Sequence, residues 1–188
     1  MYRLVVGISG ASGMPLAQAV LENLGMVPDL EVHLMISKGS EQVLQAECGL
    51  TSAHLRRHAH AAYEISDMAA GPSSGSWRHD GMLVCPCSMS SLASIANGTG
   101  INLLHRAADV TLKERRPLVL VARETPFNLI HLRNMLAVTE AGGTIMPFTP
   151  AFYTRDVSLE AMMRHFTGRL LDQFHIPHHL CKRWNNDC

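Results

Sequence analysis

The chain of 188 residues has no excess of charge of either sign, because 16 lysines and arginines balance 16 aspartates and glutamates. Without a basic field, general binding to nucleic acid is not expected. No apolar run reaches the roughly 18–20 residues that span a bilayer. The start, Met1-Tyr2-Arg3-Leu4, leads straight into a short strand, unlike a signal peptide. We therefore expect a cytoplasmic protein with no membrane span.

Aromatic residues and paired cysteines are also scarce. Aromatics make up 5% of the chain against 47% for all hydrophobic residues, which predicts an aliphatic core typical of buried parallel strands. The five cysteines are an odd number without C-x-x-C pairs, a pattern that favours reduced thiols over a disulfide framework. The length suits one domain, so we expect residues 1–188 to form a single domain with a C-terminal helix and a short tail.

Short apolar runs alternate with amphipathic segments of helix length, which is the pattern of β-α-β units. The expected strands are Leu4–Ile8, Val32–Ile36, Met82–Cys85, Leu118–Val121 and Thr144–Met146. Parallel strands need right-handed crossovers, which place helices on both faces of the sheet. The sequence therefore predicts an α/β fold, a three-layer, open, mostly parallel sheet of Rossmann-like or flavodoxin-like type, with its ligand at the carboxyl ends of the strands.

A glycine-rich turn, Gly7-Ile8-Ser9-Gly10-Ala11-Ser12-Gly13, follows the first strand and precedes a helix expected to begin near Met14-Pro15. Glycines let backbone amides approach an anion at a helix N-terminus. The glycine spacing matches neither the G-x-G-x-x-G fingerprint of dinucleotide sites nor a P-loop. The turn is therefore a candidate anion site, and a tight turn with a capping serine is the alternative.

Serines follow the third expected strand, after the dipeptide Pro86-Cys87. Ser88, Ser90 and Ser91 can surround a phosphate or the polar edge of a ring. Capping of a helix by Ser88 explains the same pattern. Cys87 is not expected to be a nucleophile, because no histidine base is specified for it and free cysteine is often a small buried hydrophobic residue.

Arg123 and Glu124 stand directly after a buried strand, at the end of the sheet where ligands bind. A guanidinium there can hold a phosphate with two hydrogen bonds, and a carboxylate can move protons. Tyr153 and Arg169 are further phosphate-capable donors near the C-terminus. These residues predict a site for a phosphorylated ligand.

Histidines at positions 54, 58 and 60 are the nearest approach to a metal motif. The spacing of His54 and His58 suits one face of a helix, but no carboxylate or third ligand is specified, so an exposed helix face is the simpler interpretation. The chain also lacks the Asp-Asp-x-x-Asp cluster with which many enzymes of prenyl diphosphates hold magnesium. We expect no metal, and a phosphate held by cations and amides.

Together these turns resemble those of the flavin prenyltransferases of the UbiX and Pad types, over nearly the whole chain from Val6 to Trp184. The matching blocks are Gly7-Ile8-Ser9-Gly10-Ala11-Ser12-Gly13, Ser37-Lys38, Ser73-Ser74-Gly75-Ser76, Pro86-Cys87-Ser88, Arg106-Ala107-Ala108-Asp109-Val110, Leu112-Lys113-Glu114, Pro117-Leu118-Val119-Leu120-Val121-Ala122-Arg123-Glu124-Thr125-Pro126, Pro150-Ala151-Phe152-Tyr153 and Arg183-Trp184. So many blocks in the same order make the resemblance specific.

The resemblance implies a metal-independent enzyme that joins a dimethylallyl group, from dimethylallyl monophosphate or diphosphate, to reduced FMN. Its product is the prenylated FMN used by UbiD-type decarboxylases in quinone biosynthesis or aromatic-acid decarboxylation. By this likeness FMN would be contacted by Gly10, Ala11, Ser12, Ser37, Ser88, Met89, Ser90, Ser91, Arg106 and Arg123. The prenyl phosphate would be bound by Lys113, Arg123, Tyr153, Arg169 and Trp184. The catalytic residues would be Glu47, Glu124, Lys113 and Ser12.

In this family the site is closed by neighbouring subunits of a dodecamer, so a homo-oligomer is expected. The chain departs from the family pattern at Gly39-Ser40, where Ala-Ala or Trp-Ala is usual, at Cys48-Gly49, and at Ser91, where Thr is common. Two alternatives remain. One is an FMN-dependent cysteine decarboxylase, whose Pro-x-Met-Asn-x-x-Met-Trp segment is not found here. The other is a non-catalytic FMN-binding accessory subunit of an aromatic-acid decarboxylase.

Overall fold

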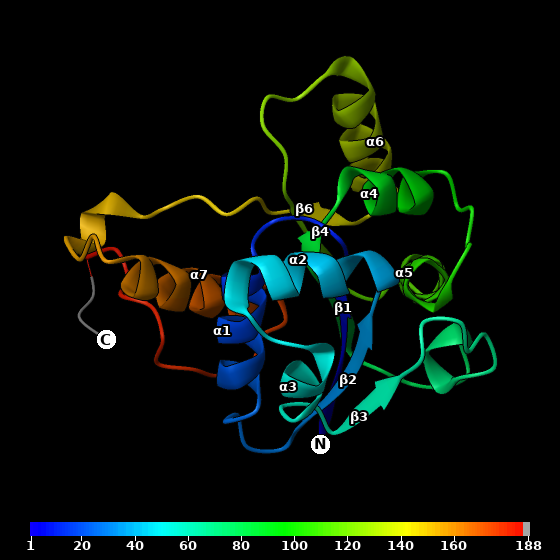
Figure 1. The fold of residues 1–188 in the computed structure, drawn as a ribbon, viewed down its shortest axis with the longest axis horizontal. Coiled ribbons are helices and arrows are strands. Elements are labelled where there is room, and N and C mark those ends of the chain that lie inside the picture. The colour runs from blue at the N-terminus through cyan, green and yellow to red at the C-terminus, as the bar shows by residue number, and fades with distance from the viewer. Residues whose placement is uncertain (186–188) are drawn as a thin grey trace.

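Six parallel strands form one sheet in the computed structural model, which describes residues 1–185 (Figure 1). They are β1 (Tyr2–Ile8), β2 (Leu30–Ile36), β3 (Ala61–Tyr63), β4 (Gly81–Cys87), β5 (Leu118–Ala122) and β6 (Thr144–Ile145). Every neighbouring pair is parallel, in the order β3-β2-β1-β4-β5-β6. This is the Rossmann-like strand order, and it confirms the predicted fold class. The edge strand β3 was not expected, because its three residues, Ala-Ala-Tyr, are too short a run to stand out.

Helices cover both faces of the sheet. They are α1 (Met14–Leu24), α2 (Lys38–Cys48), α3 (Ser52–Arg56), α4 (Met89–Ala96), α5 (Leu103–Lys113), α6 (Leu129–Glu140) and α7 (Leu159–Gln173), with short 3-10 turns η1 (Gly71–Ser73) and η2 (Phe152–Thr154). Side chains of α1, α2, α3 and α7 share a core with Leu4, Val6 and Ile8 of β1. Those of α4, α5 and α6 share a second core with Val5. Alternate side chains of each strand thus enter two aliphatic cores, as a three-layer fold requires.

The turn after β1 touches the first turn of α2 through two glycines. A Cβ atom added to Gly10 would lie 2.9 Å from the carbonyl carbon of Gly39 and 3.1 Å from its oxygen. The next residue, Ser40, is fully buried, and its hydroxyl donates to the carbonyl of Ile8 at 2.9 Å. Gly10 is therefore required by a close approach of two backbones at the carboxyl edge of the sheet.

The cysteines that can be described fit the expectation of reduced thiols. Cys48, Cys85 and Cys87 are free thiols, whereas Cys188 lies outside the described residues. Burial raises the pKa of Cys87 to about 12, so this thiol stays protonated at neutral pH and is a poor nucleophile.

Within residues 1–185, none of the helices combines the length and the apolar character that a bilayer crossing requires.

The contact between the two glycines generates a prediction with a matched control. Gly10→Ala should lower the free energy of unfolding by about 1–3 kcal/mol, because backbone atoms of Gly39 cannot move as a flexible side chain can. Gly39→Ala should be nearly neutral, since its Cβ would lie 3.8 Å from the Cα of Gly10, an ordinary contact. Urea unfolding of both variants measures the difference, and equal stabilities would contradict the prediction.

Candidate active site

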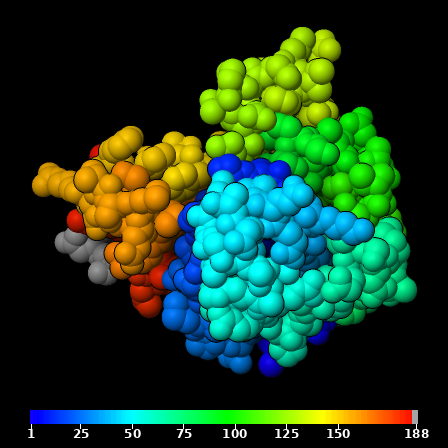
Figure 2. Space-filling view, viewed as in Figure 1, coloured from blue at the N-terminus to red at the C-terminus, as the bar shows by residue number. Residues whose placement is uncertain are grey.

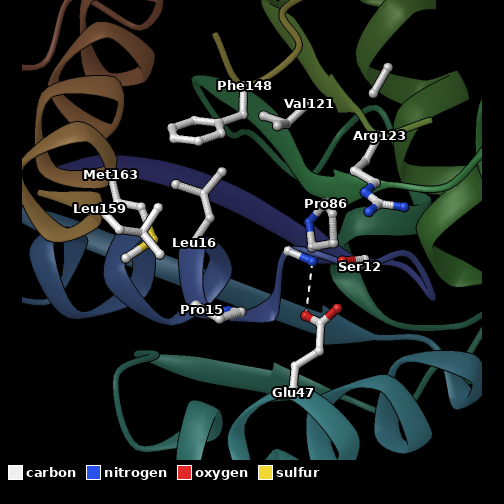
Figure 3. Close-up of a pocket in the computed structure, with 12 residues that line it drawn as sticks. Ser12, Pro15, Leu16, Glu47, Pro86, Val121, Arg123, Phe148, Leu159 and Met163 are labelled. Carbon is white, nitrogen blue, oxygen red and sulfur yellow. Dashed lines mark hydrogen bonds between the residues drawn. The ribbon is translucent and has the colours of Figure 1, made fainter. Parts of the chain in front are cut away.

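A pocket of about 460 Å³ lies at the carboxyl ends of β1, β4 and β5 (Figure 3). The chain order reverses between β1 and β4, which is the switch point where open α/β sheets bind ligands. Polar groups of Ser12, Glu47 and Arg123 line one side. The other side is apolar and includes Leu16, Phe148, Leu159 and Met163. This combination suits a ligand with a flat apolar body and polar edges.

Ser9 joins two of the turns that border the pocket. Its hydroxyl donates to the carbonyl of Pro86 at 3.0 Å and accepts the backbone N–H of Ser88 at 2.8 Å. Ser9 is 1% exposed, so both bonds are shielded from water. The sequence assigned no separate role to Ser9, because its partners lie 77 and 79 residues away and no local pattern reveals them.

The carboxylate of Glu47, near the end of α2, binds the first turn of α1 (Figure 3). Its Oε2 accepts the backbone N–H groups of Gly13 at 2.9 Å and of Met14 at 2.8 Å. Gly13 precedes the helix in the left-handed region, with φ of 114°. From the sequence we expected a ligand anion at this helix start. The structure corrects that expectation, because a carboxylate of the chain itself holds these two amides.

Hydrogen bonds and charge lower the pKa of Glu47. Partial burial acts to raise it, but the side chain of Ser12, the two backbone amides of α1 and the positive charge of Arg123 outweigh burial. Glu47 is therefore ionised at neutral pH. It stands between Ser12 and the helix start as an acceptor of hydrogen bonds.

The turn after β2 presents Ser37 beside the glycine-rich turn. The Ser37 hydroxyl lies 2.9 Å from the hydroxyl of Ser40, and the Ser37 backbone N–H donates to Ile8 at 2.9 Å. Across from it, Gly10 contacts Gly39. Gly10, Ala11, Ser12 and Ser37 therefore share one stretch of the carboxyl edge, as their proposed common role requires.

Ser88 caps α4, which was the alternative that the sequence left open. Its hydroxyl accepts the backbone N–H of Ser91 at 3.2 Å. Ser91 is buried, and its hydroxyl lies 3.2 Å from Nε2 of His105 on α5. Met89 is half-buried and Ser90 is exposed. The hydroxyls of Ser88 and Ser91 are thus engaged within the fold, whereas Ser90 presents an exposed one.

The end of β5 carries Arg123 to the rim of the pocket. Its backbone N–H donates to the carbonyl of Cys87 at 3.0 Å and so joins β5 to β4. The guanidinium lies beside Pro86 and Ser12 (Figure 3). Glu124 follows and is exposed, with Oε1 accepting the backbone N–H of Thr125 at 3.0 Å. A cation and a carboxylate therefore stand at the mouth of the site.

Arg106, on the first half of α5, holds the segment after β3 against that helix. Its Nε donates to the carbonyl of Ser73 at 3.1 Å, and its Nη1 donates to Asp109 at 2.5 Å. Arg116 acts in the same way, with Nη2 donating to the carbonyl of Gly75 at 2.8 Å. Within one chain, Arg106 positions a loop and does not line the pocket of about 460 Å³.

Lys113 lies at the opposite end of the sheet from Arg123. It ends α5, where it pairs with Glu114 beside Gly75. Strand β5 separates the two cations by its five residues, which is roughly 16 Å. One chain therefore does not bring Lys113 to the pocket of Arg123, although the sequence placed both at one phosphate.

Tyr153, Arg169 and Trp184 form a second cluster near the C-terminus. The ring centroids of Tyr153 and Trp184 are 5.2 Å apart and nearly perpendicular. The Tyr153 hydroxyl lies 3.2 Å from Nε2 of His165. Arg169 pairs with Asp172 on α7 and lines the same hollow of about 370 Å³ as Tyr153. Tyr153 thus contacts Trp184 and shares with Arg169 a hollow that is separate from the first pocket.

Comparison with known proteins identifies the family. Residues 1–167 match the flavoprotein family. The chain is 45% identical to the flavin prenyltransferase LpdB of Lactiplantibacillus plantarum, over 100% of both chains. It is 49% identical to a probable UbiX-like flavin prenyltransferase of Bacillus subtilis, over 97% of this chain and 89% of that one. The chain belongs to the UbiX-like flavin prenyltransferases. This confirms the resemblance inferred from the sequence.

Solved structures agree with this family. AnUbiX (PadA1), crystallised with FMN and dimethylallyl pyrophosphate, has a TM-score of 0.95 and 47% identity, over 98% of both chains. A dodecameric FMN-dependent UbiX-like decarboxylase from Escherichia coli O157:H7 has a TM-score of 0.94 and 43% identity, over 97% of this chain and 98% of that chain. The peptidyl-cysteine decarboxylase EpiD is 16% identical at a TM-score of 0.66, over 93% of this chain and 99% of that one, and shows a shared fold alone.

The environment of Glu47 predicts a pH-dependent stability. Because its pKa is lowered in the folded state, the ionised carboxylate stabilises the fold above the unfolded-state pKa, and this contribution is lost as pH falls through the folded-state pKa. Glu47→Gln should therefore lower the urea midpoint near neutral pH. The difference from wild type should narrow on acidification below about 4.3, the usual pKa of a glutamate.

Glu140→Gln serves as the control, because Glu140 is exposed at the end of α6. Its urea midpoint should follow that of wild type at every pH. A difference between Glu47→Gln and wild type that stays constant with pH would show that the charge of Glu47 contributes nothing to stability.

Proposed function

We propose that this chain is a flavin prenyltransferase that joins a dimethylallyl group from dimethylallyl phosphate to reduced FMN. The observation that carries the proposal is the pocket at the switch point, whose polar and apolar sides suit a flavin ring. Further support comes from AnUbiX (PadA1), a structure of FMN and dimethylallyl pyrophosphate in a chain 47% identical at a TM-score of 0.95.

The residues at the pocket fit FMN. Glycines and amides of the β1 turn allow close approach of a polar ring edge or a phosphate. Arg123 supplies a fixed positive charge at the rim, and Phe148 and Leu16 supply an apolar wall for the ring. The residues proposed to hold FMN are Gly10, Ala11, Ser12, Ser37, Ser88, Met89, Ser90, Ser91, Arg106 and Arg123.

The chemistry that reduced FMN supplies is an electron-rich ring that takes up the allylic carbon as the carbon–oxygen bond to phosphate breaks. The role of the protein is to bind the leaving phosphate and to hold protons. Arg123 donates hydrogen bonds to the phosphate oxygens as negative charge grows on them. Glu47, with Ser12, and Glu124 accept or return protons at the pocket mouth. Trp184 is suited to face positive charge on the prenyl group.

Subunit assembly completes this site in our proposal. Lys113 ends α5 about 16 Å from Arg123 within one chain, so Lys113 would reach a phosphate from a neighbouring subunit. Tyr153 and Arg169 would do so as well, from their own hollow. Helix α6 stands away from the body of the chain (Figures 1 and 2) and exposes apolar side chains that suit subunit contacts. These are Leu129, Ile130, Leu132 and Leu136, exposed by 50–66%.

A homo-oligomer, a dodecamer like that of the Escherichia coli relative, would bury these apolar faces. The prenylated FMN would then pass to a UbiD-type decarboxylase as its recipient. An FMN-binding accessory subunit without catalysis is the competing function, and it differs from our proposal in leaving the flavin unchanged.

The first functional prediction concerns the reaction itself. Anaerobic incubation of the protein with reduced FMN and dimethylallyl phosphate should release a flavin heavier by one five-carbon prenyl group, seen by mass spectrometry. The control omits the prenyl phosphate. If both ligands bind and the flavin mass is unchanged, the transferase assignment is wrong and the accessory function is favoured.

The second functional prediction concerns residues that different subunits contribute to one site. Arg123→Ala and Lys113→Ala should each abolish most prenyl transfer. Mixed oligomers, made by refolding the two variants together, should recover activity at roughly a quarter of the sites, where an intact Arg123 of one subunit meets an intact Lys113 of another. No recovery in verified mixed oligomers would place both residues in one subunit's site.

A further inference from the structure

A cluster of three metal-ligating side chains lies outside the proposed flavin site. It consists of Glu22 on α1, His54 on α3 and His58 just after α3. One ligand atom from each, an imidazole nitrogen or a carboxylate oxygen, lies within 4.8 Å of the other two, and all three side chains are partly buried. The sequence pointed to the two histidines but specified no carboxylate. Folding supplies it from 32 residues before His54.

The backbone around the cluster is well anchored. Leu55, fully buried, fixes α3 against the core. The backbone N–H of His58 donates to Leu55 at 3.1 Å, so the helical turn continues to His58. The rings of His54 and His58 have centroids 6.0 Å apart. On the other side, a Cβ added to Gly25, which ends α1, would lie 3.5 Å from the carbonyl of His58. The ligands therefore need little movement to converge.

The donor set matches the preference of a borderline divalent cation. Two imidazoles and one carboxylate are ligands that zinc takes in a tetrahedral site, with water in the fourth position. A hollow of about 580 Å³ borders Glu22 and His58 and leaves room for that water. Calcium and magnesium are disfavoured, because both prefer a shell made of oxygen atoms.

We propose that Glu22, His54 and His58 bind one zinc ion that clips the C-terminal end of α1 to α3. The neutral imidazoles of His54 and His58 give nitrogen lone pairs and Glu22 gives a carboxylate oxygen. Helix α1 begins at the flavin pocket and ends at this cluster after 11 residues, which is about 15 Å. The clip is thus remote from the pocket and serves stability.

Of the groups beside the cluster, Gln18 favours zinc binding and Arg57 opposes it. Gln18 donates to Oε1 of Glu22 at 2.8 Å and orients the carboxylate, in the manner of outer-shell partners of metal ligands. The exposed guanidinium of Arg57 contacts the ring of His54 and must turn toward solvent when a cation binds. Removal of its positive charge should therefore tighten zinc binding.

A second group, Asp172 with His178 and Cys181, is less suited to a metal ion. Arg183 holds the carboxylate of Asp172 with two hydrogen bonds, at 2.5 and 2.7 Å, and Arg169 pairs with it as well. A cation at this position would have to displace two guanidinium groups. Glu22, by contrast, accepts a hydrogen bond from the neutral side chain of Gln18, and within residues 1–185 no guanidinium pairs with it.

Zinc titration of the FMN-loaded full chain tests the proposal, with isothermal calorimetry as the readout. Wild type should bind one equivalent per chain at this site. His58→Ala and Glu22→Gln should each weaken binding by about tenfold or more. His179→Ala, which removes an exposed histidine elsewhere, should leave it unchanged, and Arg57→Gln should strengthen it. Flavin absorbance should be the same in all variants, which verifies their folding.

Two further measurements use the same variants. Zinc should raise the thermal midpoint of wild type but not that of His58→Ala, because a ligand that binds the native state stabilises it. Cobalt should give a tetrahedral visible spectrum without the intense thiolate band that Cys181 would add. The proposal is overturned if zinc binds equally well to His58→Ala and wild type, if no stoichiometric binding occurs, or if the thiolate band is dominant.

Discussion

The hydroxyl of Ser9 links the carboxyl ends of β1 and β4, and the rest of the site depends on this link. It accepts from the backbone N–H of Ser88 and donates to the carbonyl of Pro86, which also accepts the backbone N–H of Ser9 at 3.2 Å. The part-buried N–H of Ser88 would cost about 1–3 kcal/mol if left unpaired. The link sets the separation of two turns, to which the contact of Gly10 with Gly39 adds the first turn of α2 after β2 and the bond from Arg123 to Cys87 adds the end of β5. Four strand ends thereby form one rim.

Each candidate cation of the site has a carboxylate of its own chain beside it. Arg106 pairs with Asp109, Lys113 with Glu114 and Arg169 with Asp172, and Arg123 lowers the pKa of Glu47. Partly exposed pairs of this kind contribute only about 0–1 kcal/mol. An anionic phosphate can therefore replace the carboxylates with little loss of free energy. A single chain keeps these cations paired with carboxylates, and in the proposed oligomer Lys113, Arg123 and Arg169 would meet at one phosphate.

The sequence predicts the features that depend on residues close together in the chain, namely the strands and the turns that follow them. Four of the expected strands lie within slightly longer strands of the structure. The polar turns after them carry Ser12, Ser37 and Arg123 to one edge, since parallel strands must end together. The position of Glu47 was not predicted in the same way, because its bonds to α1 span 33 and 34 residues. The location of Lys113 was missed for a different reason. A helical connection between two parallel strands must return the chain to the amino edge of the sheet. The topology alone therefore separates Lys113 from Arg123, and their shared phosphate was implied only by the family resemblance.

Helix α1 runs from the flavin pocket to the proposed zinc site, and its length limits the electrostatic interaction between the two sites. Its first turn binds Glu47, and its last turns carry Glu22. A doubly charged ion at Glu22 would lie about 15 Å from the first turn. Its Coulomb interaction energy with the carboxylate of Glu47 would be about 0.5 kcal/mol in water before screening by salt. Physiological salt, with a Debye length of about 8 Å, reduces this further. A bound cation would therefore leave the protonation of Glu47 nearly unchanged. Its effect would come through the core that α1 and α3 share, and would be seen in the stability of the fold.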